Sequence, residues 1–221
     1  PPRSTLFPYT TLFRSATSGQ NPQFTDDELE AIITTAREYG LPVAAHAHGI
    51  EGMKRAIRAG VNSIEHGTFI DDDAVKLMKQ NGTVLVPTLT VAEWATEKAK
   101  EEGYFPEVVR KKAAQVGPVT KKALERAYKG GVNIVFGTDF SGDNNLGEFA
   151  LMVKAGMKPM DTIIAATLNA AQLQRVDDKL GSIEAGKLAD IVAVKGNPID
   201  DIRAMENMIF VMKNGKIYKQ P

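Results

Sequence analysis

The sequence predicts an α/β fold in which part of a (β/α) barrel is followed by a small β-rich unit. First, short apolar runs alternate with amphipathic helical patterns from Phe24 onward, which is typical of parallel βα units. Second, polar residues follow several of these runs directly, as they do at the catalytic face of a barrel. Third, the pattern changes at Gly181 to short strands and turns.

Composition is that of a globular chain whose partners bind at local sites. The 221 residues are 43% hydrophobic, and 27 basic residues balance 27 acidic ones, so no global field draws the protein to nucleic acid or to an anionic membrane. Cysteine is absent, which excludes disulfides and thiol catalysis. The apolar runs are too short to span a bilayer. We expect a small-molecule or peptide substrate, and the sequence leaves open both homo-oligomerisation and a cytoplasmic or exported location.

The first segment, residues 1–15, reads PPRSTLFPYTTLFRS and sustains neither a helical nor a strand period. STLF and TTLF recur in it around a Pro-Tyr pair. We interpret it as non-native sequence and exclude it from the fold. The alternative is a native disordered tail.

The βα units can be located from caps and apolar runs. Thr25 is an expected N-cap, three acidic residues follow it, and the helix should end near Gly40. The segment 88–117 is expected to combine a loop with helical pieces that cover a site. Expected strands are 43–45, 61–65, 83–87 and 132–136, and further helices are expected up to residue 60 and over 71–78, 120–129, 146–155 and 160–173.

An open doubly wound sheet is the alternative to the barrel. That fold would use a glycine-rich phosphate loop, and neither G-x-G-x-x-G nor G-x-x-x-x-G-K-[ST] occurs. The C-terminal segment has a different pattern. Asn214-Gly215 lies between the apolar runs 210–212 and 217–218, which predicts a hairpin. This β-rich unit is too small to fold without the barrel beside it.

The candidate chemistry lies at strand ends. All three histidines, His46, His48 and His66, fall within residues 46–66, and Asp139 follows a later strand. Imidazole and carboxylate groups suit zinc and similar divalent ions. A single histidine at a strand end is more often a hydrogen-bonded structural group, but the recurrence on successive units favours a metal site. His48 is a candidate substrate contact, or a residue that contacts the metal ligands rather than the metal itself.

Weaker candidates surround this set. Thr88 stands just beyond a strand end and is a candidate substrate contact. Glu65 is expected to point behind the strand or to make a structural bond, because neighbours in a strand alternate between faces. Trp94, Tyr104 and Phe105 are candidate pocket residues, although packing is the more common role of such aromatics.

Five motifs resemble the amidohydrolase superfamily. They are V-A-A-H-A-H-G, S-I-E-H-G, F-G-T-D, A-T-L-N-A-A-Q-L and G-S-I-E-A-G-K-L-A-D-I-V, in the expected order over residues 24–218. The most similar branch is that of the imidazolonepropionase-like enzymes, which include prolidase-type dipeptidases and carboxypeptidases that release basic residues.

The resemblance implies that residues 16–180 form strands five to eight, the C-terminal half, of a TIM-like (β/α)8 barrel, and that residues 181–221 form part of a small composite β-sandwich domain. It implies metal ligation by His46 after the fifth strand, His66 after the sixth and Asp139 after the eighth, with His66 and Asp139 also catalytic. The implied cofactor is a divalent metal, zinc being expected, with one or two ions in the full-length enzyme.

Two parts of the family pattern have no match here: a His-x-His pair after the first strand and a carboxylated lysine after the fourth. We therefore expect a fragment that is inactive alone. The expected function is hydrolysis of C–N bonds in dipeptides, acylated amino acids or cyclic amides by metal-activated water. A noncatalytic or weakly metal-binding module, or a deaminase, remains the alternative.

Overall fold

A computed structural model describes residues 21–142 and 145–221. Residues 1–15, interpreted as non-native, therefore lie outside the described part. At the centre, strands β1 (Ala44–Ala47), β2 (Ser63–His66) and β3 (Val84–Val86) form a parallel sheet in sequence order. The expected strand at 132–136 contributes one parallel bridge to β3, between Leu85 and Ile134, rather than a full strand.

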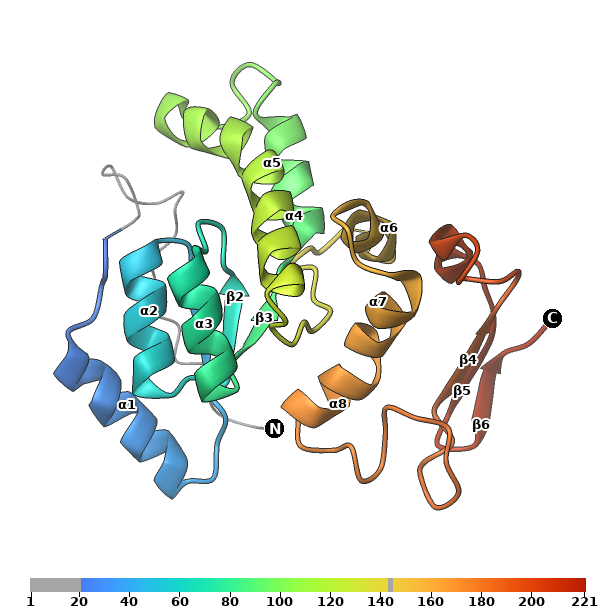
Figure 1. Ribbon diagram of the computed structural model, residues 1–221. Coiled ribbons are helices and arrows are strands. Elements are labelled where there is room, and N and C mark those ends of the chain that lie inside the picture. Colours follow the sequence, from blue (N-terminus) through green and yellow to red (C-terminus); the bar gives the residue numbers. More distant parts are fainter. Residues whose placement is uncertain (1–20, 143–144) are drawn as a thin grey trace.

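Three helices cover one face of this sheet: α1 (Asp26–Glu38), α2 (Ile50–Ala59) and α3 (Asp72–Asn81) (Figure 1). The N-cap prediction at Thr25 is confirmed, since its hydroxyl accepts from the backbone N–H of Glu28 while the Glu28 carboxylate accepts from the backbone N–H of Thr25. The core between helices and sheet is fully buried and aliphatic, and it includes Met53, Ile57, Ile64, Met78, Leu85 and Leu124.

The prediction that segment 88–117 combines a loop with helical pieces is confirmed, but the predicted start of the next helix at residue 120 is wrong. Helix α4 (Leu89–Lys98) follows β3, and α5 (Glu107–Lys129) starts well before the predicted residue 120. Gly117 and Pro118 are poor helix formers, but α5 continues through both. The Thr96 hydroxyl of α4 lies 3.0 Å from both the N–H of Gly117 and the carbonyl of Ala113, an i, i+4 pair. A neighbouring side chain thus bridges the interrupted turn.

Three shorter helices follow: α6 (Gly147–Lys154), α7 (Pro159–Ala166) and α8 (Leu168–Leu173). The single helix expected at 160–173 is divided at Thr167, whose backbone angles of −121° and −87° are not helical. In the described part of the chain, no helix has both the length and the apolar character needed to cross a membrane.

The C-terminal unit is an antiparallel sheet of β4 (Ile191–Val194), β5 (Met208–Lys213) and β6 (Lys216–Lys219), with a 3-10 turn, η1 (Ile202–Glu206), before β5. The hairpin prediction is confirmed: Asn214 and Gly215 both have positive φ, as a tight hairpin turn requires. The unit docks on α6, where Ile202 and Met205 pack against Phe149.

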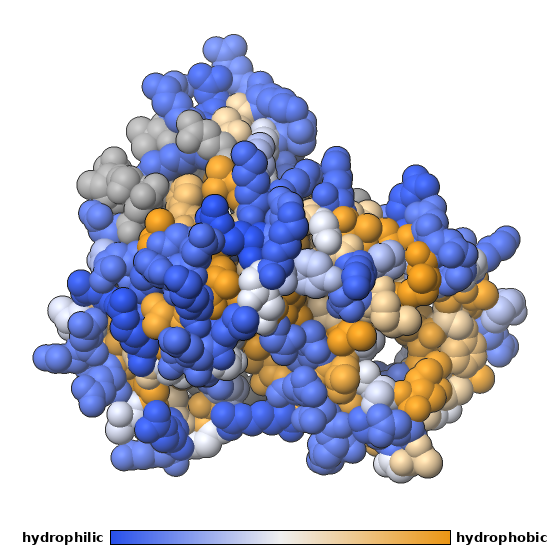
Figure 2. All heavy atoms as spheres, viewed as in Figure 1, coloured by the Kyte–Doolittle hydropathy of each residue, from blue (hydrophilic) through white to orange (hydrophobic). Residues whose placement is uncertain are grey.

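Apolar side chains are exposed on this C-terminal unit. Ile183 is 85% exposed, and Val192 of β4 and Ile217 of β6 are about half exposed. Figure 2 shows apolar residues gathered over this end of the molecule.

Substitution of Gly181 by alanine should destabilise the protein by about 2–4 kcal/mol. Gly181 has a φ of +91°, and a Cβ there would lie 2.7 Å from the Ala171 Cβ and 3.0 Å from the Leu168 Cα. Gly186 is a matched control, because its φ is +94° but no atom lies within 4 Å of the added Cβ. Urea unfolding should show the smaller loss for Gly186→Ala, and equal losses would contradict the steric explanation.

Candidate metal centre

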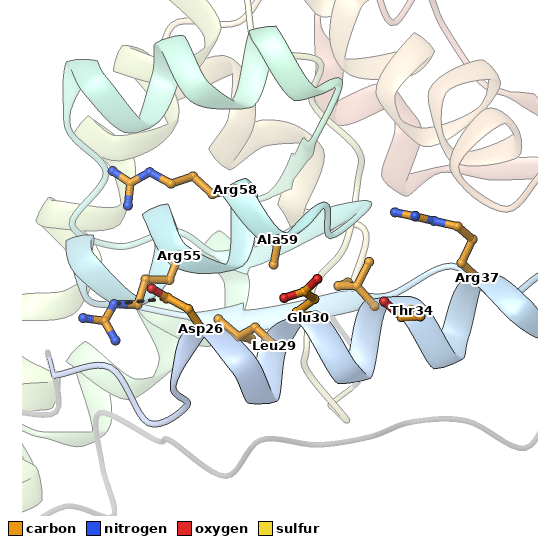
Figure 3. Close-up of a pocket in the computed structure, with 9 residues that line it drawn as sticks. Asp26, Leu29, Glu30, Thr34, Arg37, Arg55, Arg58 and Ala59 are labelled. Carbon is orange, nitrogen blue, oxygen red and sulfur yellow. Dashed lines mark ion pairs between the residues drawn. The ribbon is translucent and has the colours of Figure 1, made fainter.

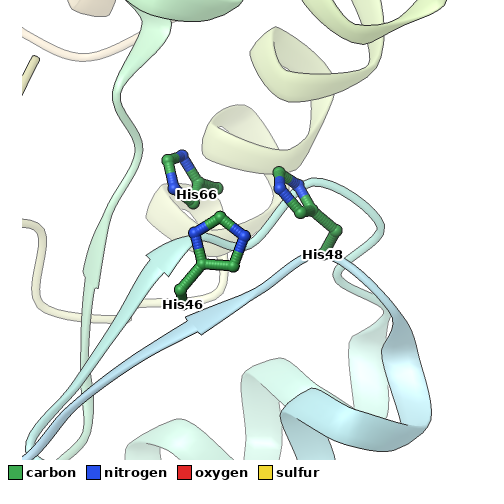
Figure 4. Close-up of side chains that lie close together, drawn as sticks. All are labelled: His46, His48 and His66. Atoms are coloured by element: carbon green, nitrogen blue, oxygen red, sulfur yellow. The ribbon is translucent and has the colours of Figure 1, made fainter. Parts of the chain in front are cut away.

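The three histidines converge at the carboxyl edge of the parallel sheet (Figure 4). His46 lies within β1, His66 is the last residue of β2, and His48 follows β1 directly. Their ring centroids are 4.4–4.9 Å apart. One potential ligand atom from each ring lies within 4.8 Å of the others. Adjacent parallel strands thus bring together the side chains that the sequence singled out.

Two of the imidazoles are oriented by threonine hydroxyls. The Nδ1 of His48 is 2.7 Å from the Thr68 Oγ1, and the Nδ1 of His66 is 2.7 Å from the Thr88 Oγ1. Both threonines are buried. In the tautomer whose Nδ1–H donates to the hydroxyl, Nε2 carries the lone pair that a metal would accept.

Burial keeps these rings in the neutral form that ligates metals. Removal from water and, to a smaller extent, the nearby His46 together lower the pKa of His48 to about 3. Burial likewise holds the pKa of His66 well below its ordinary value, with smaller contributions from His48 and His46. Protons therefore compete weakly with a cation at this site.

Asp139 stands beside the histidines on the side of His66. Its Oδ2 is 3.8 Å from the His66 Nε2, and its side chain is 65% exposed. His66, Thr88 and Asp139 all have positive φ, between 46° and 72°. Non-glycine residues held in this region cost about 1–3 kcal/mol each and cluster at functional sites. The donor set of three neutral imidazoles and one carboxylate fits a divalent transition metal such as zinc.

The predicted residues therefore come together, with two shifts in emphasis. His48 lies as close to the other imidazoles as they lie to each other, so it is a candidate ligand as well as the predicted substrate contact. Thr88 contacts His66, and its predicted contact with substrate stays a prediction. Glu65 makes a structural bond, as expected of it: it accepts a 2.6 Å hydrogen bond from the Ser63 hydroxyl.

Sequence reasoning missed two buried polar residues near the centre. Thr68 orients His48, and its place two residues after His66 resembled an ordinary loop position. Glu148 is fully buried and accepts hydrogen bonds from the backbone N–H groups of Leu89 and Thr90, at the start of α4. The signal for Glu148 was a lone acid in the otherwise apolar run 146–153.

A cavity of about 280 Å³ adjoins the histidines. Trp94 and Phe105 line it and also pack edge to face with centroids 6.1 Å apart, so the pocket and packing interpretations both apply. Tyr104 packs against both rings outside the lining. The remaining walls come from the three histidines, Asp139 and side chains of α4 and α5.

A second hollow, of about 380 Å³, lies between α1 and α2 (Figure 3). Arg37 and Arg58 line it, and Arg55 forms an ion pair with Asp26 at 3.7 Å. It contains none of the histidines and no strand end. We therefore assign the candidate chemistry to the smaller cavity.

The metal-free protein should lose stability as the pH falls below about 6.5. The pKa of His48 is lower in the folded state than in the unfolded state, so the unfolded chain takes up the proton first. We expect His48 alone to remove about 2–3 kcal/mol of unfolding free energy between pH 6.5 and about 4.5. Urea unfolding across this range, with His48→Gln as the comparison, measures it. An unchanged slope in the variant would show that His48 does not carry the effect.

Comparison with known proteins agrees with this geometry. The family model described as "Amidohydrolase family" matches residues 13–218. Ochratoxinase of Aspergillus niger is 34% identical over 90% of this chain and 42% of its own length. Imidazolonepropionase of Shewanella oneidensis is 28% identical over 91% of this chain and 47% of its own.

A solved structure is also closely similar. The crystal structure of a Xaa-Pro dipeptidase with methionine bound in its active site superposes with a TM-score of 0.89 and 54% sequence identity, over 91% of this chain and 50% of that one. The chain thus spans about half the length of the relatives that it matches. The match of the family model over residues 13–218 shows that the chain belongs to the amidohydrolase family.

Proposed function

We propose that this chain supplies part of the active site of a metal-dependent hydrolase that cleaves C–N bonds in dipeptides, acylated amino acids or cyclic amides. The observation that carries the proposal is the cluster of His46, His48 and His66, whose ligand atoms lie within 4.8 Å of one another beside a cavity. The names of the relatives, a Xaa-Pro dipeptidase and an ochratoxinase, support this reaction class.

The similarity to these relatives also supports a proposal about the fold. We propose that residues 16–180 correspond to strands five to eight of a TIM-like (β/α)8 barrel, and residues 181–221 to part of a β-sandwich domain. The parallel order β1-β2-β3, with the bridge from Leu85 to Ile134, supports it. The carboxyl ends of such strands form the catalytic face of a barrel.

Different residues around the cavity would bind the metal, transfer the proton and orient the imidazole rings. A divalent metal bound by His46, His66 and Asp139 would polarise the scissile carbonyl and make water a stronger nucleophile. The Asp139 carboxylate would take a proton from the attacking water and return it to the leaving nitrogen, and its position 3.8 Å from the His66 Nε2 supports this role. Thr88 and Thr68 hold their imidazoles in place, so that little reorganisation is needed during the reaction.

Zinc binding to the purified 221-residue chain tests the centre directly. Equilibrium dialysis should give saturable binding that His46→Ala weakens by about 10- to 100-fold or more. Glu97→Gln, an exposed change on α4, is the control and should leave binding unchanged. Absence of saturable binding by the unmodified chain would overturn the proposed centre.

The reaction is tested on the gene product isolated from its source. Metal-dependent release of amino acids from Xaa-Pro dipeptides or acylated amino acids is the expected result. Zinc binding without hydrolysis of any such amide would favour the noncatalytic module. Release of ammonia from a substrate with an amino-substituted ring, without cleavage of any peptide, would favour a deaminase.

A further inference from the structure

We propose that the cavity beside the histidines binds an uncharged apolar side chain, such as that of leucine, methionine or phenylalanine, on the substrate residue that flanks the scissile bond. Basic and acidic side chains are excluded from it. The catalytic meaning of this inference rests on the proposed function. Its structural basis is the chemistry of the cavity wall.

The wall facing the histidines is apolar. Helix α4 contributes Val91, Ala92 and Trp94, and the following segment contributes Phe105. Val109 and Val116 of α5 complete this side of the lining. No Lys, Arg or Glu side chain occurs among the described residues that line the cavity. Contact with such a surface favours a ligand group that carries no charge.

The three threonine hydroxyls of the lining already have partners. The hydroxyls of Thr68 and Thr88 pair with histidine rings, and the Thr120 hydroxyl donates to the backbone carbonyl of Val116. Asp139, the one carboxylate in the lining, stands at the histidine end beside His66. A carboxylate placed against Trp94 and Phe105 would therefore be desolvated without a counter-charge, which is costly. An ammonium would gain about 2 kcal/mol at most from the aromatic faces, which is less than the cost of removing an unpaired charge from water.

The volume and position of the cavity define which part of a substrate it receives. About 280 Å³ is at the small end of ligand sites, which span about 300–1,000 Å³, so it suits one side chain rather than a whole peptide. His46, His48 and His66 line the same cavity. The bound side chain therefore belongs to a residue adjacent to the reacting carbon.

Trp94 provides a direct test, because it is the only tryptophan of the chain and lines the cavity. The zinc-loaded 221-residue chain is titrated with N-acetyl-leucine amide, N-acetyl-lysine amide and N-acetyl-glutamate amide, and Trp94 fluorescence is recorded. These probes share one backbone and differ in the side chain alone. We expect the leucine probe to bind at least about 10-fold more tightly than either charged probe.

Two changes at Val91, a half-buried residue of α4, sharpen the test. Val91→Glu should weaken the leucine probe and strengthen the lysine probe, each by about 10-fold, because it adds a carboxylate to the apolar wall. Val91→Ala, which disturbs the fold less, should weaken only the leucine probe, by a few-fold. Glu97→Gln lies on the exposed part of the same helix and should change neither.

The outcomes separate this inference from the proposed function. Equal affinities for the three probes, a preference for a charged one, or no fluorescence response at all would overturn the apolar site. Selective binding of the leucine probe, together with no hydrolysis by the gene product, would support the apolar site and overturn the proposed hydrolase.

Discussion

Replacement of Glu148 by alanine should destabilise the protein by about 3–5 kcal/mol. Glu148 of α6 is fully buried, and its carboxylate accepts from the N–H of Leu89 at 2.8 Å and from the N–H and hydroxyl of Thr90 at 2.7 and 2.6 Å. Alanine would leave these donors, at the positive end of α4, without partners and create a cavity. Urea unfolding measures the loss.

Two variants determine which part of the Glu148 contact matters. Burial raises the pKa of Glu148, and this effect outweighs the lowering by the hydrogen bonds from Thr90 and Leu89. The site therefore accepts a neutral side chain, and Glu148→Gln should destabilise the protein by about 1–2 kcal/mol, which is less than Glu148→Ala. Thr90→Val removes one hydroxyl donor and should cost about 1 kcal/mol. If Glu148→Ala cost no more than Thr90→Val, the carboxylate would not be what holds the start of α4.

The effect of Glu148 should extend to the candidate centre. Thr88, the residue before α4, has a φ of +51° and contacts the His66 ring. A disturbed helix start would release this residue to relax toward an ordinary conformation. We expect Glu148→Ala to weaken zinc binding although Glu148 itself contacts no histidine ring.

The sequence predicted the centre because its signals are local. His46 is the last residue but one of β1 and His66 is the last of β2, so the βα pattern was sufficient to place both at one edge of a parallel sheet. The Asn214-Gly215 turn was predictable for the same reason, since the turn type depends on two residues.

The parts that were not predictable depend on contacts distant in sequence. Gly117 and Pro118 are helix-breaking residues, and the Thr96 hydroxyl that contacts the Gly117 N–H and supports α5 there comes from another helix. Glu148 meets its partners 58 and 59 residues away, so no pattern within α6 shows that its carboxylate is satisfied. The apolar cavity likewise exists only once α4 and α5 pack together.

Substitution of Asp139 by asparagine should lower kcat of the gene product by about 10²- to 10⁴-fold, on the proposed role of this carboxylate as proton acceptor. Asparagine keeps the shape of the side chain and tolerates the positive φ of 46° better than most residues, so the backbone should be undisturbed. Zinc binding through the imidazoles should persist but weaken, because the rings remain in place while an amide is a poorer ligand than a carboxylate.

The separate measurement of kcat and KM distinguishes a lost base from a damaged site. Asp139→Asn should lower kcat and kcat/KM by the same factor with KM little changed, because only an interaction made in the transition state is lost. Asp139→Ala is the comparison for backbone effects, since alanine adopts positive φ less readily and should add about 1 kcal/mol of destabilisation. An Asp139→Asn protein that retained more than about a tenth of the activity would assign proton transfer to another group. His66, whose Nε2 is 3.8 Å from the Asp139 carboxylate, would be the first residue to change next.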